Sequence, residues 1–154
     1  MFKQVISWSA ASLMAFGAVY LVTSAAMLVP AFLSGTRGVR TALVSVWFLV
    51  TVLLVGVAVV FRTLTITIEH GSLNVAFGPL HERLPLPAIT DCRVVSYDWR
   101  EWGGWGIRYG RGATLYNVAG DHGLAVQISR DDGTRLLFSS PDPQATCGAL
   151  QVRR

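Results

Sequence analysis

The stretch TALVSVWFLVTVLLVGVAVVF, residues 41–61, contains no charged side chain and lies between Arg40 and Arg62. An α-helix of about 20 residues crosses the roughly 30 Å hydrocarbon core of a bilayer. An arginine at the centre of a membrane helix costs about 2.5–3.5 kcal/mol on insertion scales, so flanking arginines mark the ends of a span. The stretch therefore predicts a transmembrane helix over residues 41–61.

A second apolar segment, residues 8–33, precedes this span and carries no charge. It is long enough to cross a bilayer, and Trp8 stands where an aromatic anchor at headgroup level belongs. The connector over residues 34–40 is short and turn-like, and its Arg37 and Arg40 mark a membrane boundary. The two segments predict an antiparallel membrane hairpin with both chain ends on one side of the bilayer.

Two other interpretations of the apolar segments fit less well. The core of a cleaved signal peptide has about 7–15 residues. Residues 8–33 exceed that length, and no clear A-x-A cleavage pattern follows them. A soluble pair of buried helices would not need two spans of this length in near succession.

The charged residues are divided unequally along the chain. Residues 1–61 contain Lys3, Arg37 and Arg40 and no acid, whereas residues 62–154 contain ten basic and nine acidic residues. The formal net charge of +4 therefore comes mainly from the flanks of the apolar segments. A nucleic-acid-binding protein would gather basic side chains on one folded face, so no nucleic-acid partner is expected.

Neither charge nor cysteine content settles the orientation. The positive-inside rule compares two arginines in the connector with Lys3 and Arg62 on the other side, which is a tie. Small secreted domains held by disulfides usually contain more cysteines than Cys92 and Cys147. The two can still pair, but the count favours a reducing compartment and two small buried side chains.

After Arg62 the hydrophobic period changes to two, which is typical of half-buried strands. Residues 63–69 and 72–77 alternate in this way around His70-Gly71, which predicts a β-hairpin. Pro85 and Pro87 indicate that the next strand lies at a sheet edge. Further strands are expected over residues 82–86, 91–97, 107–109, 113–118, 124–128 and 135–139.

The chain ends in a predicted helix, residues 144–152, that would bury Ala145 and Leu150, with Cys147 as a further candidate. About seven short strands followed by one helix predict a β-sandwich or a partly open barrel. The expected organisation is a two-helix transmembrane anchor over residues 1–62 and a β-rich domain over the rest of the chain, residues 63–154.

The most unusual stretch is WREWGGWGIRYGRG, residues 99–112, in which tryptophan recurs every third residue. In one interpretation the indole rings fill the core and the glycines permit a bend. In the other, exposed tryptophan beside arginine forms a contact surface for a protein partner or for lipid headgroups. The candidate contact residues are Trp99, Trp102, Trp105, Arg108 and Arg111.

This stretch also contributes to a likeness with a known family. The chain resembles bacterial membrane-anchored PH-like domain proteins in its two apolar segments and in Trp102–Arg108, Tyr116–Gly120 and Ser139–Pro143. The resemblance implies a PH-like barrel with a C-terminal helix and a cytoplasmic β domain. It brings no established catalytic residue.

The sequence contains only fragments of enzyme motifs. His81–Pro85 begins like H-E-x-x-H, but Pro85 stands where the second zinc-binding histidine belongs. Gly104 and Gly106 begin a G-x-G pattern, but Tyr109 replaces the third glycine. We therefore expect no metal, no cofactor and no enzymatic activity.

These observations favour a non-enzymatic, membrane-tethered interaction or scaffold module, such as an accessory subunit of a larger membrane complex. Its expected partners are the lipid bilayer and a membrane protein or a second copy of the chain. The alternative is a lipid-binding or lipid-sensing module, and the least favoured function is that of a membrane enzyme with an unrecognised site.

Overall fold

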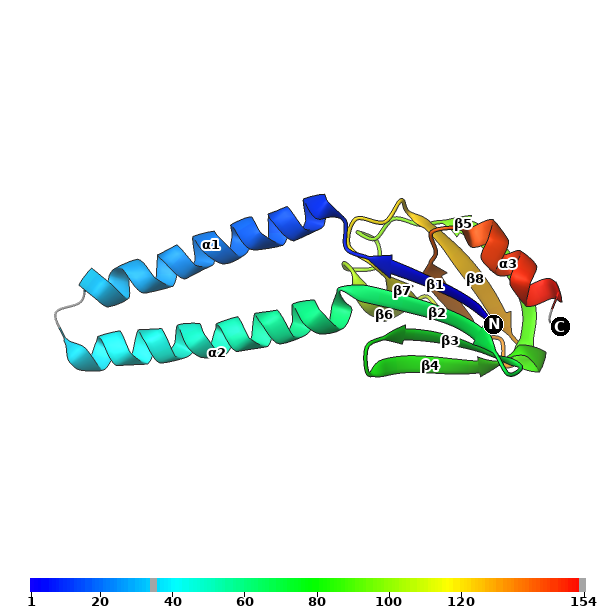
Figure 1. Cartoon of the computed structure of the whole chain (residues 1–154), viewed down its shortest axis with the longest axis horizontal. Helices are drawn as coiled ribbons and strands as arrows, with labels where there is room; N and C mark the ends of the chain where they lie inside the picture. Colours follow the sequence, from blue (N-terminus) through cyan, green and yellow to red (C-terminus); the bar gives the residue numbers. More distant parts are fainter. Residues whose placement is uncertain (34–35, 153–154) are drawn as a thin grey trace. The chain divides into compact units, whose positions relative to one another are not determined.

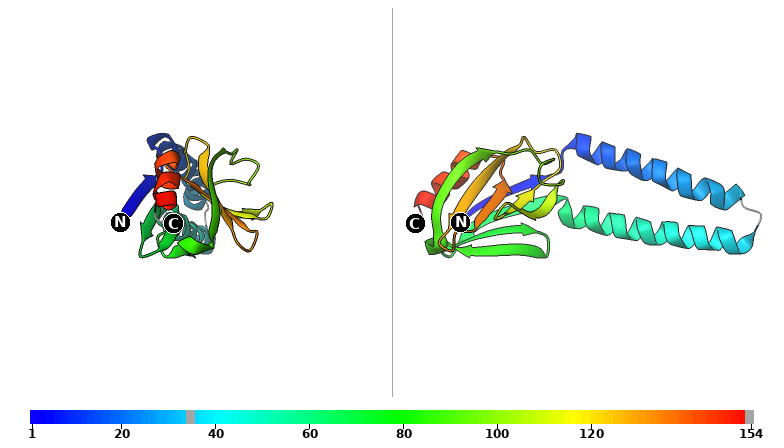
Figure 2. Two further views of the ribbon diagram at one scale, coloured as in Figure 1. Left: turned by 90° about the vertical axis from the view of Figure 1, so that its right-hand side faces the viewer. Right: turned by 180° about the vertical axis from the view of Figure 1, so that it is seen from behind.

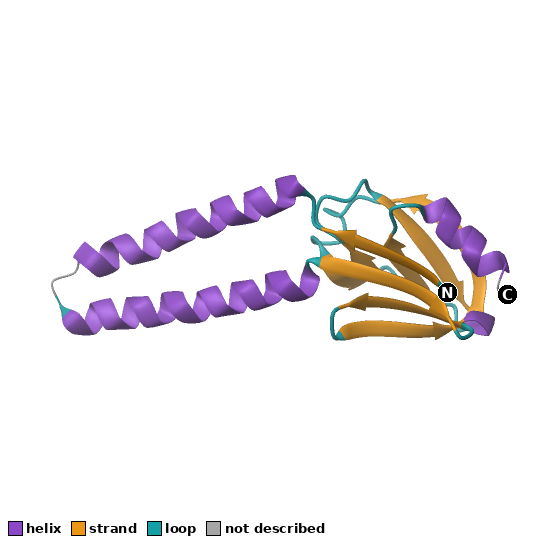
Figure 3. Cartoon of the chain, in the orientation of Figure 1, coloured by secondary structure: helices purple, strands orange, loops and turns teal. Residues whose placement is uncertain are grey.

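The structure is a computed structural model that describes residues 1–33 and 36–152 (Figure 1). The chain divides into a helical unit, Ala10–Val59, and a β unit made of Met1–Ser9 and Val60–Arg154. Figure 3 distinguishes helices from strands by colour. The elements are β1 (Phe2–Ser7), α1 (Ala10–Leu33), α2 (Arg37–Phe61), β2 (Thr63–Glu69), β3 (Ser72–Phe77), β4 (Leu80–Pro85), a 3₁₀ turn η1 (Leu86–Ala88), β5 (Ile89–Ser96), β6 (Gly106–Gly110), β7 (Ala113–Asn117), β8 (Leu124–Arg130), β9 (Arg135–Ser139) and α3 (Pro143–Val152).

Both predicted spans are helices that are long and apolar enough to cross a membrane. The most apolar windows of α1 and α2 have mean hydropathies of 1.9 and 2.8, and 6% and 0% of their residues are buried. The hydrogen bonds between the helices include the Tyr20 hydroxyl with Thr51 Oγ1, 3.3 Å apart, and Trp47 Nε1 donating to Ser24 Oγ at 3.1 Å. Pairing these polar groups with one another keeps them off the apolar outer surface.

The start of α2 differs from the predicted connector. We expected a turn over residues 34–40, but α2 begins at Arg37, and residues 34–35 lie outside the described part of the chain. The Thr36 carbonyl accepts a hydrogen bond from the Arg40 N–H at 3.2 Å. Arginine is a good helix former, and N–H groups in a first turn need no acceptor within the helix. The two arginines therefore lie in the first turn of α2 rather than in a loop.

β1 is a strand that we did not expect from the sequence. Residues 2–7 pair antiparallel with residues 63–68 of β2. Along β1, half-buried and exposed side chains alternate, with Gln4 on the half-buried side and Val5 on the exposed side. Because Gln4 is polar on the half-buried side and Val5 is apolar on the exposed side, the sequence of β1 lacks the period-two hydrophobic pattern of a strand. The expected division into residues 1–62 and 63–154 differs from the observed units because the first strand belongs to the β unit.

Gln4 links β1 to the C-terminal helix. Its Oε1 accepts hydrogen bonds from Ser140 Oγ at 2.7 Å and from Thr146 Oγ1 at 2.9 Å. Its Nε2 donates to the carbonyl of Asp142 at 3.4 Å. Thr146 is fully buried, so a lost partner cannot be replaced freely by water.

We expect Gln4→Ala to lower the free energy of unfolding of the β unit by about 1–3 kcal/mol, the usual effect of removing a partner from buried hydrogen-bonding groups. The neighbouring Lys3 is exposed on the other side of β1, so Lys3→Ala should change it by less than about 0.5 kcal/mol. Denaturant titration of the full chain in detergent measures both. Equal effects of the two substitutions would contradict the role assigned to Gln4.

The strands form two separate sheets. The first has the order β1-β2-β3-β4 and the second the order β5-β8-β9-β7-β6. All pairs are antiparallel except β7 with β9, which is parallel. The strands expected between residues 63 and 139 are present with ends that differ by no more than two residues, and β4 is an edge strand as its prolines predicted. Neither sheet closes on itself within the described residues, so the PH-like barrel implied by the resemblance is not confirmed.

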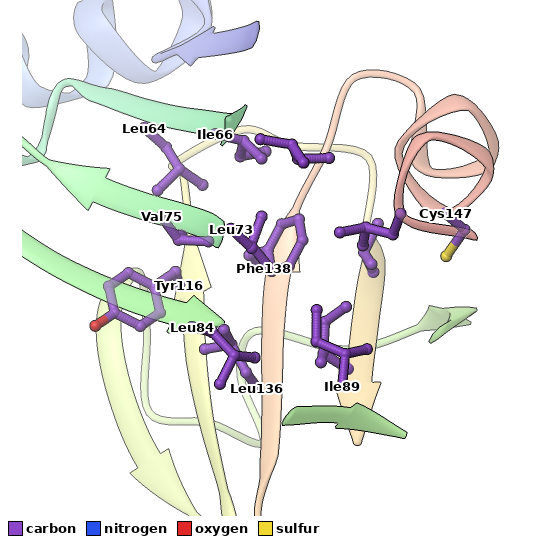
Figure 4. Packing of buried hydrophobic residues seen from close by; sticks show 14 of the residues in the cluster. Leu64, Ile66, Leu73, Val75, Leu84, Ile89, Tyr116, Leu136, Phe138 and Cys147 are labelled. Carbon is purple, nitrogen blue, oxygen red and sulfur yellow. The ribbon is translucent and has the colours of Figure 1, made fainter. Parts of the chain in front are cut away.

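The core of the β unit lies between the two sheets. Side chains from both sheets meet there, and Figure 4 shows Leu73 of β3 beside Phe138 of β9. Burying a side chain of this size stabilises the fold by about 1.5–3 kcal/mol. No tryptophan belongs to the buried cluster in the described part of the chain. The fully buried large residues are Phe77, Phe138, Leu64, Ile66, Ile68, Leu73, Leu115, Ile128, Leu136, Val75, Val118 and Val126.

α3 covers one side of this core. It packs against β5 and β8 and is tied to β1 through Gln4, so it joins an edge strand of each sheet (Figure 2). Leu150 and Cys147 are buried as expected, whereas Ala145 is exposed, so its predicted burial was wrong. Three residues advance a helix by about 300°, so residues 147 and 150 share a face that residue 145 leaves.

Candidate functional site

The tryptophan-rich segment forms a compact loop between β5 and β6, which we call the Trp loop, residues 98–105. The N–H groups of Trp102 and Gly104 both donate to the Trp99 carbonyl, at 3.2 and 3.0 Å. Asp98 Oδ1 accepts the Arg100 N–H at 2.9 Å, an Asx turn that starts the loop. The loop is therefore held by its own backbone hydrogen bonds and presents its side chains from a defined frame.

Two of the three tryptophans of the loop are stacked. The ring centroids of Trp99 and Trp105 lie 4.2 Å apart at an interplanar angle of 27°. The guanidinium carbon of Arg100 lies 4.5 Å from the Trp99 ring centroid. An aromatic pair contributes about 0.5–1.5 kcal/mol beyond its buried area, and an exposed cation–π contact about 0.5–1 kcal/mol. Trp105 nevertheless stays 41% exposed, so the stack presents aromatic surface to its surroundings.

The other candidate contact residues have different surroundings. Trp102 is half-buried. Arg108 is half-buried against the loop, where its Nη2 lies 3.0 Å from the position that a Cβ on Gly104 would occupy. Arg111 is exposed and pairs with Glu101 at 2.9 Å, which links the β6–β7 turn to the Trp loop. Exposed pairs of this kind contribute at most about 1 kcal/mol, so this one orients the loop more than it stabilises the fold.

Two surface residues were not singled out from the sequence. Tyr109 on β6 is 79% exposed, and Arg100 makes the cation–π contact described above. The Gly-Gly-Trp-Gly-Ile-Arg-Tyr run drew attention to the glycines and tryptophans. Alternation along β6 places Tyr109 on the same face as Ile107, which packs against the core, so the pattern gave no sign that Tyr109 is exposed.

The predicted membrane-boundary residues of the β unit meet near the start of β6. Trp8 is half-buried, and its Nε1 donates to the Phe61 carbonyl at 2.9 Å. The Trp8 backbone N–H donates to the Arg62 carbonyl at 3.0 Å. The Phe61 ring lies 3.3 Å from the position of a Cβ on Gly106, whose φ of +97° is in the region that favours glycine. The strand that follows the Trp loop thus starts against the residue that ends α2.

A partly buried polar cluster forms around Tyr97, the residue directly before the Trp loop. The Tyr97 hydroxyl and the Ser139 hydroxyl both donate to Asp121 Oδ2, and the two hydroxyl oxygens are 3.1 Å apart. Burial, and next the hydrogen bond to the Asp121 carboxylate, raises the pKa of Tyr97 well above its ordinary value. Within the described residues, Asn117 Nδ2 donates to the Gly104 carbonyl at 3.4 Å and so joins the sheet to the loop.

The raised pKa of Tyr97 predicts a loss of stability in strong alkali. A tyrosine in the unfolded chain ionises near pH 10, whereas in the folded chain burial keeps Tyr97 protonated. The folded state then binds more protons than the unfolded state above pH 10, so the free energy of unfolding falls as pH rises. Burial also raises the pKa of Tyr116, which adds to the slope.

We expect Tyr97→Phe to reduce this slope between about pH 10 and 12, because one of the two groups with a raised pKa is gone. Denaturant titrations of the full chain at several pH values measure it. Leu124→Ala, at an exposed residue that does not titrate, is the control and should leave the slope unchanged. A slope unaffected by Tyr97→Phe would contradict the assignment.

The Trp loop presents aromatic and cationic side chains at the surface. Among the described residues, no three His, Cys, Asp or Glu side chains are grouped as a metal site requires. A hollow of about 60 Å³, near the size of two water molecules, is lined by Leu86, Ile89, Asp91, Cys92, Leu150 and Gln151, none of which belongs to the Trp loop.

Comparisons with protein-family models, with curated proteins and with solved structures found no match.

Proposed function

We propose that the chain is a non-enzymatic interaction module, tethered to a membrane by α1 and α2, that docks a membrane protein or a second copy of itself. The observation that carries the proposal is the stacked pair Trp99–Trp105 with Arg100 on Trp99, held in a hydrogen-bonded loop and partly exposed. Tyr109, four positions after Trp105 in the chain, adds a second highly exposed aromatic side chain. We call Trp99, Arg100, Trp105 and Tyr109 the recognition surface.

The composition of the recognition surface supports binding to a protein. Tryptophan, tyrosine and arginine are the residues most enriched among those that dominate binding energy in protein interfaces. The stack also reduces the entropy cost of binding, because its rings are already ordered before a partner arrives. Residues 62–154 contain ten basic and nine acidic residues, so net charge does not favour a strongly charged partner.

A lipid headgroup region is the second candidate partner. The contact between Phe61 and Gly106 favours it, because Phe61 ends α2 and Gly106 directly follows Trp105. If α2 spans a bilayer, this part of the β unit lies within a few residues of the membrane surface, where tryptophan is enriched. The near-neutral charge speaks against it, since recognition of anionic lipid uses clusters of about 4–8 basic residues.

We also infer a distant relation to bacterial PH-like domain proteins. Its support is the order of elements, in which β-strands of two sheets are followed by a terminal helix that covers one side of the core. The sequence resemblance over Trp102–Arg108 also supports this relation.

Purification of the full chain in mild detergent tests the proposal. We expect a stoichiometric protein partner, or a dimer, that is lost in the double variant Trp99→Ala/Trp105→Ala. Leu124→Ala is the matched control, because Leu124 is exposed to the same degree as Trp105, at 42% against 41%. A retained lipid that is lost in the double variant would favour the second candidate. If the double variant retained the same protein, the proposed role of the recognition surface in binding would be contradicted.

A further inference from the structure

The two cysteines of the chain form a disulfide. Cys92 of β5 and Cys147 of α3 are joined, their Cα atoms lie 5.7 Å apart, and 55 positions separate them in the sequence. Cys147 is buried, and both residues pack in or against the core. The sequence favoured a reducing compartment and two small buried side chains. Cys147 is buried, whereas Cys92 is half-buried, and the two are bonded to each other.

The disulfide attaches α3 to β5, in addition to the packing and the hydrogen bonds of the helix. α3 has ten residues, too few for stability as an isolated helix in water. It joins an edge strand of each sheet, with the disulfide at β5 and the Gln4 hydrogen bonds at β1. Reduction of the bond would leave the helix attached by its hydrogen bonds and by the packing of its buried side chains, among them Thr146 and Leu150.

A disulfide between two segments of a domain indicates that the domain lies in an oxidising compartment. Disulfides form and persist in oxidising surroundings and are rare where thiols are kept reduced, as in most cytosols. We propose that the β unit lies on the oxidising, non-cytoplasmic side of the membrane, with the start of α2 on the cytoplasmic side. The proposal rests on the membrane tether of the proposed function, and it opposes the cytoplasmic location implied by the resemblance.

The pairing of β1 with β2 extends the argument to both ends of the hairpin. β1 precedes α1 and β2 follows α2, and Ser7 pairs with Thr63 at the end of their ladder. Two residues paired in one sheet lie on one side of a membrane, so the chain must leave and return on that side. The other end of the hairpin carries Arg37 and Arg40, which suit the cytoplasmic side under the positive-inside rule. The tie in flanking charge is thus broken by the disulfide.

This orientation identifies where the partner of the recognition surface is found. That surface belongs to the β unit, so it is open to ligands in the oxidising compartment, such as the exposed domain of another membrane protein. Cytosolic proteins would have no access to it.

The test uses the full chain in spheroplasts, with one added thiol in the presence of the native cysteine pair. Asp132 lies in the exposed β8–β9 turn and Val39 in the first turn of α2. We expect a membrane-impermeant maleimide to label Asp132→Cys fully before permeabilisation and Val39→Cys only after it. In the unsubstituted chain, acid-trapped thiols should be absent, and a polyethylene-glycol maleimide should shift its mobility only after reduction.

Labelling of Asp132→Cys only after permeabilisation, or trapping of Cys92 and Cys147 as free thiols in cells, would overturn the proposal. Carbonate extraction of the same membranes separates this failure from that of the tether. A chain that stays in the pellet but labels in the opposite pattern is tethered and inverted, whereas a chain released by carbonate is not tethered at all.

Discussion

Replacing Phe138 with alanine is expected to lower the free energy of unfolding of the β unit by about 3–5 kcal/mol. Phe138 is fully buried near the end of β9, where it is paired with Val126 on one neighbouring strand and Tyr116 on the other. Its ring lies between the sheets, so truncation removes apolar contacts and leaves a cavity that two flanking strands prevent from closing. A domain of this size has a total stability of about 5–15 kcal/mol, so the loss is a large part of it.

Denaturant titration of the full chain in detergent, with the circular dichroism signal of the strands as the readout, measures this change. Leu124→Ala is the matched control, since Leu124 begins β8 and is 42% exposed. It should change the free energy by no more than about 0.5 kcal/mol. A loss for Phe138→Ala as small as that of the control would show that the two sheets do not share the core described above.

Gly106→Ala is expected to destabilise the β unit by about 1–3 kcal/mol, the typical cost of a side chain in a sparsely populated backbone region. Gly106 has a φ of +97°, and an added Cβ would lie 3.3 Å from the Phe61 ring. Both effects act at the point where the Trp loop enters β6. We therefore also expect a shift in the fluorescence of the adjacent Trp105, because the strand start must move to admit the methyl group.

Gly110→Ala provides the control on the same strand. No atom lies within 4 Å of a Cβ at this position, and its φ is not in the left-handed region. The substitution should leave both stability and fluorescence close to those of the unsubstituted chain. Equal behaviour of the two alanine variants would mean that Phe61 does not constrain the start of β6.

The parts of the fold that follow simple periodicity could be predicted from the sequence. β2 alternates strictly between polar and apolar residues, and β3 does so except at Ala76. The His70-Gly71 turn has positive φ at both positions, as a two-residue hairpin requires. β1 could not be predicted, because its inward Gln4 is held by a hydrogen bond to Thr146, more than 140 positions away in the chain. A local pattern contains no information about such a partner.

The candidate site was predictable in composition but not in geometry. The three-residue spacing of Trp99, Trp102 and Trp105 drew attention to the loop, yet it could not show which two rings would stack. The reason is that the pairing depends on a turn closed on the Trp99 carbonyl and on glycines with positive φ. The Cys92–Cys147 pairing depends in the same way on α3 packing against β5, a contact between distant segments.

The central claim is that the recognition surface docks a partner while α1 and α2 hold the chain in a membrane. A photo-crosslinking amino acid at Tyr109, in the full chain in its native membrane, tests it most directly. We predict one adduct of defined mass, to a membrane protein or a second copy, that disappears when Trp105→Ala is added and does not form from a probe at Asp132. Adducts to lipid alone, or the same adducts from both positions regardless of Trp105, would contradict the claim.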